Sequence, residues 1–406
     1  MESIVLQKME KRKTSCKKVS NHIPADLAVS ILSKLALKSL FRFRCVRKSW
    51  SFLFQEPYFM NMYRINFASN HNYTYVDDSC IMLETLQPYQ RGHQVLFSLS
   101  GDRLKNKVKL DLPPPFEEDD TCIEMLGSVV DGTICFYQGP VIPKIVLWNL
   151  STKEFKVLPP SPLESVPPDY DRVYCQMHGF GYDHVNHDHK VVRHVAQRVD
   201  FANYEGYKGH IPPHDSMWEV YSLRSNAWKK VEVDMPTGYM NTGLRFHTNG
   251  VCHWWDYTND QDCLVSFDLI NNKFFRTPPP PDGRDNFDFI LVDRRFVGLN
   301  GSAACILSYE TSGDTPCMFY ISILGELGVK ESWTKLFTIE SLPCLNHSIG
   351  AGNKGDIFFK SKEDELVQVD LITQMVKKLG IRDPLQFPTL FYKEVILPMG
   401  GEKYVS

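Results

Sequence analysis

A module of two short apolar strands joined by a tight turn recurs along most of this chain. Its clearest copy is VLWNLSTKEFKVLPP, which runs from Val146 to Pro160. Apolar and polar residues alternate in each half, and the polar residues between the halves are typical of a turn. Similar copies begin at Val220 (VYSLRSNAWKKVEV), Val265 (VSFDLINNKFFRTPPPP) and Val367 (VQVDLITQMVKKLGI), and a looser copy with a longer loop runs from Phe319 to Ile339. Such a chain is predicted to fold into repeated antiparallel sheets.

The spacing of the copies sets the size of the repeated unit. One aliphatic residue holds the same place in each copy, and these markers are Leu150, Leu223, Leu269, Ile323 and Leu371. The gaps between them are 73, 46, 54 and 48 residues. Most gaps are close to the ~40–50 residues of one propeller blade. The spacing therefore predicts an all-β propeller, whose blades around one axis leave only short sheet edges.

A second hairpin precedes the module and completes the predicted blade. A turn with Gly or Asn followed by an apolar strand occurs in GSVVDGTICF from Gly127, TNGVCHW from Thr248 and GNKGDIFF from Gly352. Gly and Asn suit these turns because they adopt positive φ at low cost. About six such units fit between residues 79 and 380, and a seventh stays open. The last strand candidate, Leu390 to Leu397, is expected to return and complete the first blade.

The first 60 residues lack this pattern. Residues 1–20 are polar and basic, and short helices are predicted after them. Pro24 at a first helical position and Asp26 in the first turn favour a helix start, and Ser39 can cap a second helix. Apolar residues recur at helical spacing in three groups: Leu27, Ile31, Leu32 and Leu35, then Leu40, Phe43 and Val46, then Trp50 and Leu53. Three short helices are therefore predicted over residues 21–60.

Net charge separates the same two parts of the chain. Residues 1–60 contain 12 Lys and Arg against 4 Asp and Glu, a balance of +8, whereas the rest contains 33 against 44, a balance of −11. A unit of three short helices buries little core by itself. Its apolar face therefore either contacts a partner or packs on the rest of the chain, and the periodicity does not choose between these two interpretations.

Composition argues against several classes of protein. The longest apolar runs, such as Phe289 to Val292, are far shorter than the roughly 18 residues that span a bilayer. The N-terminus has no apolar signal region and becomes basic at Lys11. The eleven cysteines are scattered without a C-x-x-C pair, which indicates reduced thiols in the cytoplasm or nucleus and argues against zinc. A net charge of −3 gives no general field that would attract nucleic acid.

The N-terminal residues resemble an F-box. The match covers HIPADL from His22, ILSKL from Ile31, KSLFRFRCV from Lys38 and KSW from Lys48. Farther along, LWNLSTKEFKVLPP and HGFGYD, which begins at His178, look like the F-box-associated domain of plant F-box proteins, which is kelch-like. The two resemblances follow each other in the order found in that family, and together they cover nearly the whole chain after residue 20.

The resemblance implies a fold and a function. The fold is α+β and multidomain: a basic tail at 1–20, an all-α F-box of three short helices at 21–60, an all-β F-box-associated propeller at 61–398 and a C-terminal tail at 399–406. The function is that of the substrate-recognition subunit of an SCF (cullin–RING) E3 ubiquitin ligase, without catalysis or cofactor of its own. The F-box would bind a Skp-family adaptor, and the propeller would bind an unknown target protein.

The resemblance also assigns the positions of the F-box that face the adaptor or form its core. They are Ile23, Pro24, Leu27, Ile31, Leu32, Leu35, Leu40, Val46, Trp50 and Leu53. The sequence alone does not show which of these residues contact the adaptor and which form the core of the F-box. The expected energetics are those of an aliphatic helix face in an apolar groove. The chain departs from the family at Ala36 and Arg47, where Pro and a small residue are usual, so docking is expected to be weakened at most.

Few residues suggest other chemistry. The spacing of His184, His187 and His189 could suit a metal, but the segment from Asp183 to Lys190 is typical of a polar turn between strands, so no metal is predicted. The sequence contains no G-x-S-x-G and no Gly-rich phosphate loop. Tryptophans on the repeated strands are expected to pack between blades, and a sugar-stacking platform is the less favoured interpretation of Trp148, Trp218, Trp228, Trp254, Trp255 and Trp333.

The largest gap between repeats holds a segment from Phe201 to His214 that is rich in aromatic residues, Gly and His. Long loops on a rigid scaffold often carry recognition. Tyr204, Tyr207 and His210 are therefore hypothesised to face the target, and the alternative is a variable insertion without contacts. Two other functions stay open: an adaptor-binding scaffold without ligase activity and, less favoured, a glycan-binding or enzymatic propeller. Neither a membrane nor nucleic acid is an expected partner.

Overall fold

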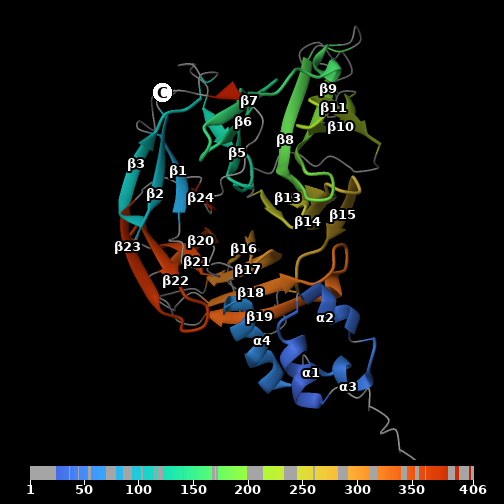
Figure 1. Ribbon diagram of the computed structural model, residues 1–406, viewed down its shortest axis with the longest axis vertical. Coiled ribbons are helices and arrows are strands. Elements are labelled where there is room, and N and C mark those ends of the chain that lie inside the picture. Colours follow the sequence, from blue (N-terminus) through green and yellow to red (C-terminus); the bar gives the residue numbers. More distant parts are fainter. Residues whose placement is uncertain are drawn as a thin grey trace, which may run out of the picture.

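A computed structural model gives the architecture of the chain. It describes residues 24–35, 37–43, 45–53, 56–69, 79–85, 94–101, 104–113, 116, 122–139, 141–166, 170, 172–198, 214–232, 245–258, 261–281, 291–310, 318–339, 345–352, 356–361, 363–382, 389–392 and 402–403. A group of helices near the N-terminus lies at one end of a mostly β structure (Figure 1).

Four helices form the first described part. They are α1 (Ala25–Leu32), α2 (Leu37–Phe43), α3 (Lys48–Ser51) and α4 (Pro57–Ser69). The first three agree with the three predicted segments, and α4 corrects the predicted number. In α4 Phe59, Tyr63 and Phe67 recur every fourth residue and their rings follow one another at 6.2 Å between centroids. This is helical spacing, and the helix continues past residue 60 into the range predicted as propeller.

Asp26 lies in the first turn of α1 as predicted, and two other predicted details of the helix starts are wrong. Pro24 precedes α1 as its N-cap, with an extended backbone. Ser39 does not cap α2 but lies inside it, because the helix begins at Leu37. The reason is that α2 follows closely after the turn of Ser33 and Lys34 that ends α1, so its first turn forms before Ser39.

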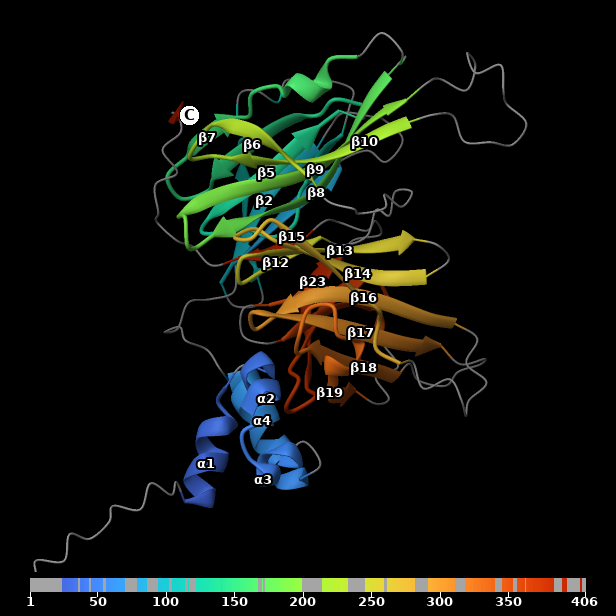
Figure 2. The same cartoon turned by 90° about the vertical axis from the view of Figure 1, so that its right-hand side faces the viewer.

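The described strands form six antiparallel sheets, five with four strands and one with five. In chain order they begin with β1 (Ser79–Thr85), β2 (Gln94–Ser100) and β3 (Asn106–Leu110), then β4 (Ile123–Met125), β5 (Thr133–Gln138), β6 (Lys144–Asn149) and β7 (Glu154–Val157), then β8 (Arg172–Asp183), β9 (Asp188–Arg198), β10 (His214–Ser222) and β11 (Ala227–Val231). The next two sheets contain β12 (Phe246–Thr248), β13 (Val251–Thr258), β14 (Gln261–Asp268) and β15 (Lys273–Thr277), then β16 (Leu291–Leu299), β17 (Ser302–Glu310), β18 (Met318–Leu324) and β19 (Trp333–Ile339). The last contains β20 (Leu345–Ala351), β21 (Ile357–Ser361), β22 (Glu365–Val369) and β23 (Val376–Arg382), and β24 (Thr389–Tyr392) and β25 (Glu402–Lys403) end the chain. The fold is thus a mostly β propeller with few helices (Figure 2).

The end of the chain closes the ring. β24 pairs antiparallel with β1, with Leu390 opposite Ile81, and so supplies the missing strand of the first sheet. This confirms the predicted return of the last strand, of which residues 393–397 lie outside the described residues. β25 then pairs with β7, with Glu402 opposite Phe155, and becomes the fifth strand of the β4–β7 sheet.

Three predicted turns of the repeated module, and the turn between β8 and β9, share one geometry. Asn149, Asp183 and Asp268 end the first strand of their turns, and Asp370 directly follows β22. The side-chain oxygen of each accepts backbone N–H groups two and three residues later at 2.6–3.1 Å. Side chains of this kind cap turns. Each turn then ends on a residue with positive φ, namely Lys153, His187, Asn272 and Gln374.

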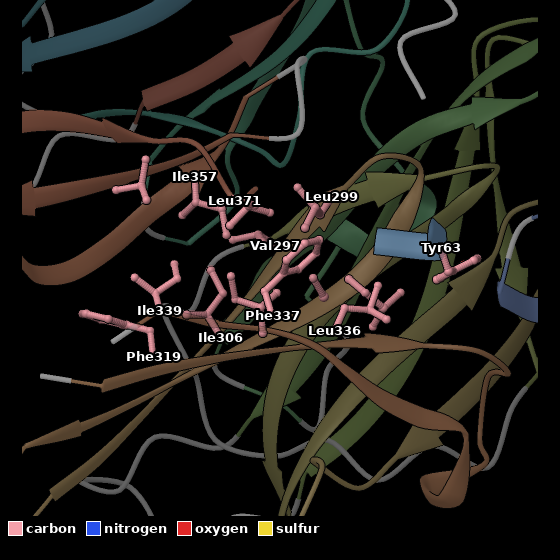
Figure 3. Packing of buried hydrophobic residues seen from close by; sticks show 14 of the residues in the cluster. Tyr63, Val297, Leu299, Ile306, Phe319, Leu336, Phe337, Ile339, Ile357 and Leu371 are labelled. Atoms are coloured by element: carbon pink, nitrogen blue, oxygen red, sulfur yellow. The ribbon is translucent and has the colours of Figure 1, made fainter. Parts of the chain in front are cut away.

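Apolar clusters lie between neighbouring sheets. Trp254 packs with Trp218 of the preceding sheet, at 5.8 Å between ring centroids, whereas Trp255 stacks on Phe296 of the following sheet at 4.7 Å. Adjacent residues on a strand thus serve opposite interfaces, as predicted for these tryptophans. The largest cluster joins the β16–β19 and β20–β23 sheets, and Figure 3 shows Tyr63 of α4 at its edge.

Candidate partner-docking surface

One face of α1 leaves apolar side chains in solvent. Leu27 and Ile31 lie one helical turn apart and are 53% and 48% exposed. Pro24 precedes them on the same helical spacing and Lys34 follows, and both are exposed. Residues three and four positions apart share a helix face. A continuous apolar stripe, here called the α1 stripe, is therefore formed by Pro24, Leu27 and Ile31. The Lys34 side chain lies at its end.

The opposite side of the helical unit is buried. Leu32, Leu40 and Leu53 join Phe59 and Tyr63 in the apolar cluster that also contains residues of the β16–β19 sheet. Burial raises the pKa of the Tyr63 hydroxyl well above its usual range, as expected for a ring placed inside a core. The helices are therefore attached to the propeller by the same apolar core that holds the sheets.

Two specific contacts fix α4 on the propeller. The Phe67 ring lies 6.4 Å from the Phe337 ring of β19, centroid to centroid. The Asn300 side-chain amide, in the turn between β16 and β17, donates to the Phe67 carbonyl at 2.7 Å. Within the helical unit, the Asn66 amide donates to the Ser33 hydroxyl at 2.8 Å and ties α4 to the end of α1. These contacts hold the α1 stripe in a set orientation.

The ten residues expected to face the adaptor or form the F-box core fall into distinct groups. Exposed are Pro24, Leu27, Ile31 and Val46; buried are Leu32, Leu40 and Leu53; half-buried are Leu35 and Trp50. Ile23 lies outside the described residues. The sequence left two interpretations of the apolar residues open, a partner or the rest of the chain, and the structure uses different faces of the same helices for each kind of environment.

Further apolar side chains are exposed after α2. Val46 is 66% exposed and Phe52 is 54% exposed, and Phe43 also reaches solvent while its ring meets Trp50 edge-on. Phe43 and Phe52 were not among the expected site residues, because a helical apolar pattern does not distinguish a core phenylalanine from an exposed one. Exposed cations accompany these residues: Lys34, Arg42, Arg47 and Lys48. The surface is therefore apolar with basic residues around it.

The histidine segment is a turn. Asp183 accepts the N–H groups of Val185 and Asn186, and the Lys190 ammonium lies 2.7 Å from the Asp183 carboxylate. His187 has positive φ and its ring contacts the Tyr182 hydroxyl. Within the described ranges, no group of three or more His, Cys, Asp and Glu side chains is arranged to hold a metal. The segment thus has the turn structure that its sequence predicts.

A buried ionic cluster lies in the β8–β11 sheet. The Arg193 guanidinium donates to Glu219 at 2.7 Å and to Glu164 at 2.6 Å, and it lies 3.8 Å from the centre of the Trp228 ring. The Ser161 hydroxyl donates to the second oxygen of Glu219 at 2.7 Å. Arg193 pairs with both glutamates, and Glu164 and Ser161 lie between β7 and β8, so the cluster anchors that connection.

The remaining predicted site residues, Tyr204, Tyr207 and His210, lie outside the described residues. The connection that contains them leaves from Arg198 at the end of β9 and returns at His214 at the start of β10. In the part of the chain that the structure describes, no helix has the length and apolar character needed to cross a membrane.

The chain is similar to known proteins over most of its length. Residues 85–359 match the family model described as an F-box associated beta propeller domain. The F-box protein CPR1 of Arabidopsis thaliana is 25% identical over 387 residues, which covers 89% of this chain and 85% of that protein. Two more Arabidopsis proteins are each 24% identical: the putative F-box protein At1g47730, over 74% of this chain and 68% of its own length, and the F-box/kelch-repeat protein At3g23880, over 79% and 80%.

Proposed function

The chain belongs to the family of plant F-box proteins with an F-box associated beta propeller domain, and on this premise we propose that it is the substrate-recognition subunit of an SCF (cullin–RING) E3 ubiquitin ligase. The helical unit binds a Skp-family adaptor and through it the ligase. The propeller binds the target protein. The chain itself carries no catalytic site, and ubiquitin transfer is done by the associated ligase.

The α1 stripe is the observation that carries this proposal. Its side chains are about half exposed although Ala28 and Leu32, on the other side of the same helix, are buried. Exposed apolar side chains arranged along one helix face suit insertion into an apolar groove of a partner. The surrounding cations favour a partner with acidic residues around that groove. Both features agree with adaptor binding by the helical unit.

The proposed division of labour follows the fold. The helical unit contacts the propeller at β18 and β19, through α2 and α4, so adaptor and target are proposed to occupy different parts of the molecule. We keep residues 21–60 as the F-box and 61–398 as the F-box-associated domain in this proposal, and α4 (Pro57–Ser69) crosses the boundary between them. Tyr204, Tyr207 and His210 stay the hypothesised target-facing residues, and their triple alanine variant is expected to weaken target binding without changing adaptor binding.

Purification of the full chain with a recombinant Skp-family adaptor tests the proposal. The double substitution Leu27→Asp and Ile31→Asp places two carboxylates on the α1 stripe. We expect adaptor affinity to fall by at least ~30-fold, since a hot spot contributes about 2 kcal/mol or more. Val185→Asp is the matched control, because Val185 is similarly exposed but lies in the turn between β8 and β9. Equal adaptor binding by the double variant and the control would contradict the proposal.

A further inference from the structure

The outer strands of the propeller differ in how their free edges are protected. An exposed edge strand can pair with another chain, and proteins commonly prevent this with lysine side chains on the edge. Among the described outer strands, β3, β11, β15, β19 and β23 each carry at least one exposed lysine: Lys107, Lys229, Lys273, Lys335 and Lys377. These five sheets end on strands that are chemically protected against pairing.

The outer edge of β7 is different. Its lysine, Lys156, is half-buried, and the apolar Val157 is 40% exposed. This is also the edge on which β25 lies, with Glu402 opposite Phe155 and Lys403 opposite Glu154. Figure 1 shows β25 beside β7 at the margin of the sheet. The one described outer strand without an exposed lysine is therefore the one that carries an added strand.

The outer edge of β7 has more outward-facing backbone N–H and carbonyl groups than β25 pairs with. The Leu158 N–H, just after β7, donates to the Ile145 carbonyl of the neighbouring strand β6 at 3.0 Å and so points away from the outer edge. Because backbone groups alternate in direction along an antiparallel strand, Phe155 and Val157 direct theirs outward. In the described structure β25 pairs with Phe155 and Glu154 and stops there. Among the described residues none pairs with the outward N–H and carbonyl of Val157, which a longer strand would reach.

The sequence explains why the chain's own strand is short. Continuing the register by two residues would set Gly400 opposite Val157, and Gly401 directly precedes β25. Glycine weakens strands because it loses the most backbone freedom and has no side chain to pack across the pair. A branched apolar residue at the register position of Gly400 would instead cover Val157. The chain's own C-terminus is therefore a weak occupant of this edge.

We propose that the edge of β7 is a docking site for an extended polypeptide segment, which the chain's own C-terminal strand covers until it is displaced. The segment adds antiparallel to β7 through backbone hydrogen bonds, and a branched apolar residue opposite Val157 gives it preference over the Gly-Gly of the C-terminus. That such a segment belongs to a target protein rests on the proposed function. The docking site itself rests on the pairing and exposure of β7.

A labelled peptide measures the site directly. The probe is fluorescein-MVTEKYVS, the last eight residues of the chain with Gly400→Val and Gly401→Thr. It is titrated by fluorescence anisotropy against the full chain, the chain ending at Pro398, and the full chain with the same two substitutions. We expect the shortened chain to bind at least about tenfold more tightly than the full chain, because the competing strand is gone. The substituted full chain should bind least.

Two substitutions in the shortened chain provide the matched comparison. Val157→Lys gives β7 the exposed lysine of the other edges and should abolish peptide binding. Val108→Lys on β3, at a similarly exposed valine, should leave it unchanged. Equal affinity of the shortened and full chains, or binding that survives Val157→Lys, would overturn the proposal. Adaptor binding measured on the same samples reports separately on the proposed function, because α1 and β7 lie in different parts of the molecule.

Amide hydrogen exchange covers the case in which the shortened chain does not fold. In the intact chain we expect the Val157 amide to exchange faster than that of Phe155, which β25 covers. The substitutions Gly400→Val and Gly401→Thr should slow exchange at Val157 by extending the strand. Unchanged exchange at Val157 in this folded variant would also overturn the proposal.

Discussion

The helical unit and the propeller treat apolar side chains in opposite ways. All six residues of β5 are buried, and the largest side chains of the sheets, including Trp148 and Phe267, are fully enclosed between neighbours. In the helical unit Leu27, Val46 and Phe52 each leave half or more of the side chain in solvent. A closed ring gives every sheet two apolar neighbours. Four short helices have one large neighbour, so one of their faces stays exposed.

The largest expected effect is on the stability of the propeller, through its buried ionic cluster. Arg193→Ala removes the cation from the buried cluster and leaves Glu219 without its charge partner. Breaking a buried ion pair in this way costs about 3–5 kcal/mol, and urea unfolding of the purified chain measures it. The double variant Arg193→Met and Glu219→Leu should recover part of the loss. If Arg193→Ala is as stable as the natural chain, the cluster does not anchor the β7–β8 connection.

A pair of leucines on one helix tests the contrast within α1. Leu32→Ala should lower the free energy of unfolding by about 3 kcal/mol, because a buried leucine leaves a cavity. Leu27→Ala should change stability by less than about 0.5 kcal/mol and weaken adaptor binding. Thermal unfolding and adaptor titration are measured on both variants. The same stability loss for both would mean that Leu27 is a core residue in solution.

Acid should weaken the propeller and spare the adaptor surface. Burial lowers the pKa of His253 to about 3, and its two ring nitrogens contact the Thr248 and Ser266 hydroxyls at 2.8 Å. Burial likewise lowers the pKa of His247 to about 4, and its Nε2 accepts the Gly250 N–H. Below the unfolded pKa of ~6.5 only the unfolded state gains these protons, so stability is full above that pH and falls toward pH 4.

At pH 5 the loss should be about 2 kcal/mol for His253 alone, by proton linkage. Urea unfolding at pH 7.5 and pH 5 measures it, and His253→Gln should reduce the pH dependence. The described part of the helical unit contains no histidine, so its adaptor affinity should change less over the same range. A stability that is flat between pH 7.5 and pH 5 would contradict the burial of neutral His253 and His247.

The smallest expected effect concerns the junction between the two regions. Asn300→Ala removes the hydrogen bond to the Phe67 carbonyl and should cost about 1 kcal/mol. We expect limited proteolysis to cleave the Asn300→Ala chain faster after α4, while the circular dichroism signal of the sheets stays unchanged. Asn271→Ala is the control, because this residue bonds only locally to Asp268 among its described contacts. Equal cleavage of both variants would show that apolar packing alone holds the junction.

The repeated module predicted local structure well, and for a physical reason. Turns such as STK, INN and ITQ need a side chain that accepts backbone N–H groups and then a residue with positive φ, and both requirements are written in adjacent residues. The return of the last strand to β1 was predicted because an open ring needs a closing strand. The fourth helix was not predicted, because the apolar residues from Phe59 onward are also compatible with a strand.

The candidate surface was predicted as a set of residues and not as a surface. Leu27, Leu32 and Leu40 have the same chemistry and the same helical spacing, so nothing local separates the exposed leucine from the two buried ones. Phe52 and Leu53 are neighbours with opposite environments for the same reason. Exposure depends on what packs against each face, and the apolar cluster that encloses Leu32, Leu40 and Leu53 includes sheet residues more than 200 positions away along the chain.

The sequence by itself determined the repeated hairpins, the helical unit and the family, because strand alternation, turn chemistry and helical spacing act between residues close in the chain. The tertiary structure decided which apolar side chains of the helices remain exposed and which edge of the propeller its C-terminus covers. Both depend on contacts between segments far apart in the chain. Glu402 and Phe155, for example, become neighbours only because the ring closes and brings the end of the chain back to the β4–β7 sheet.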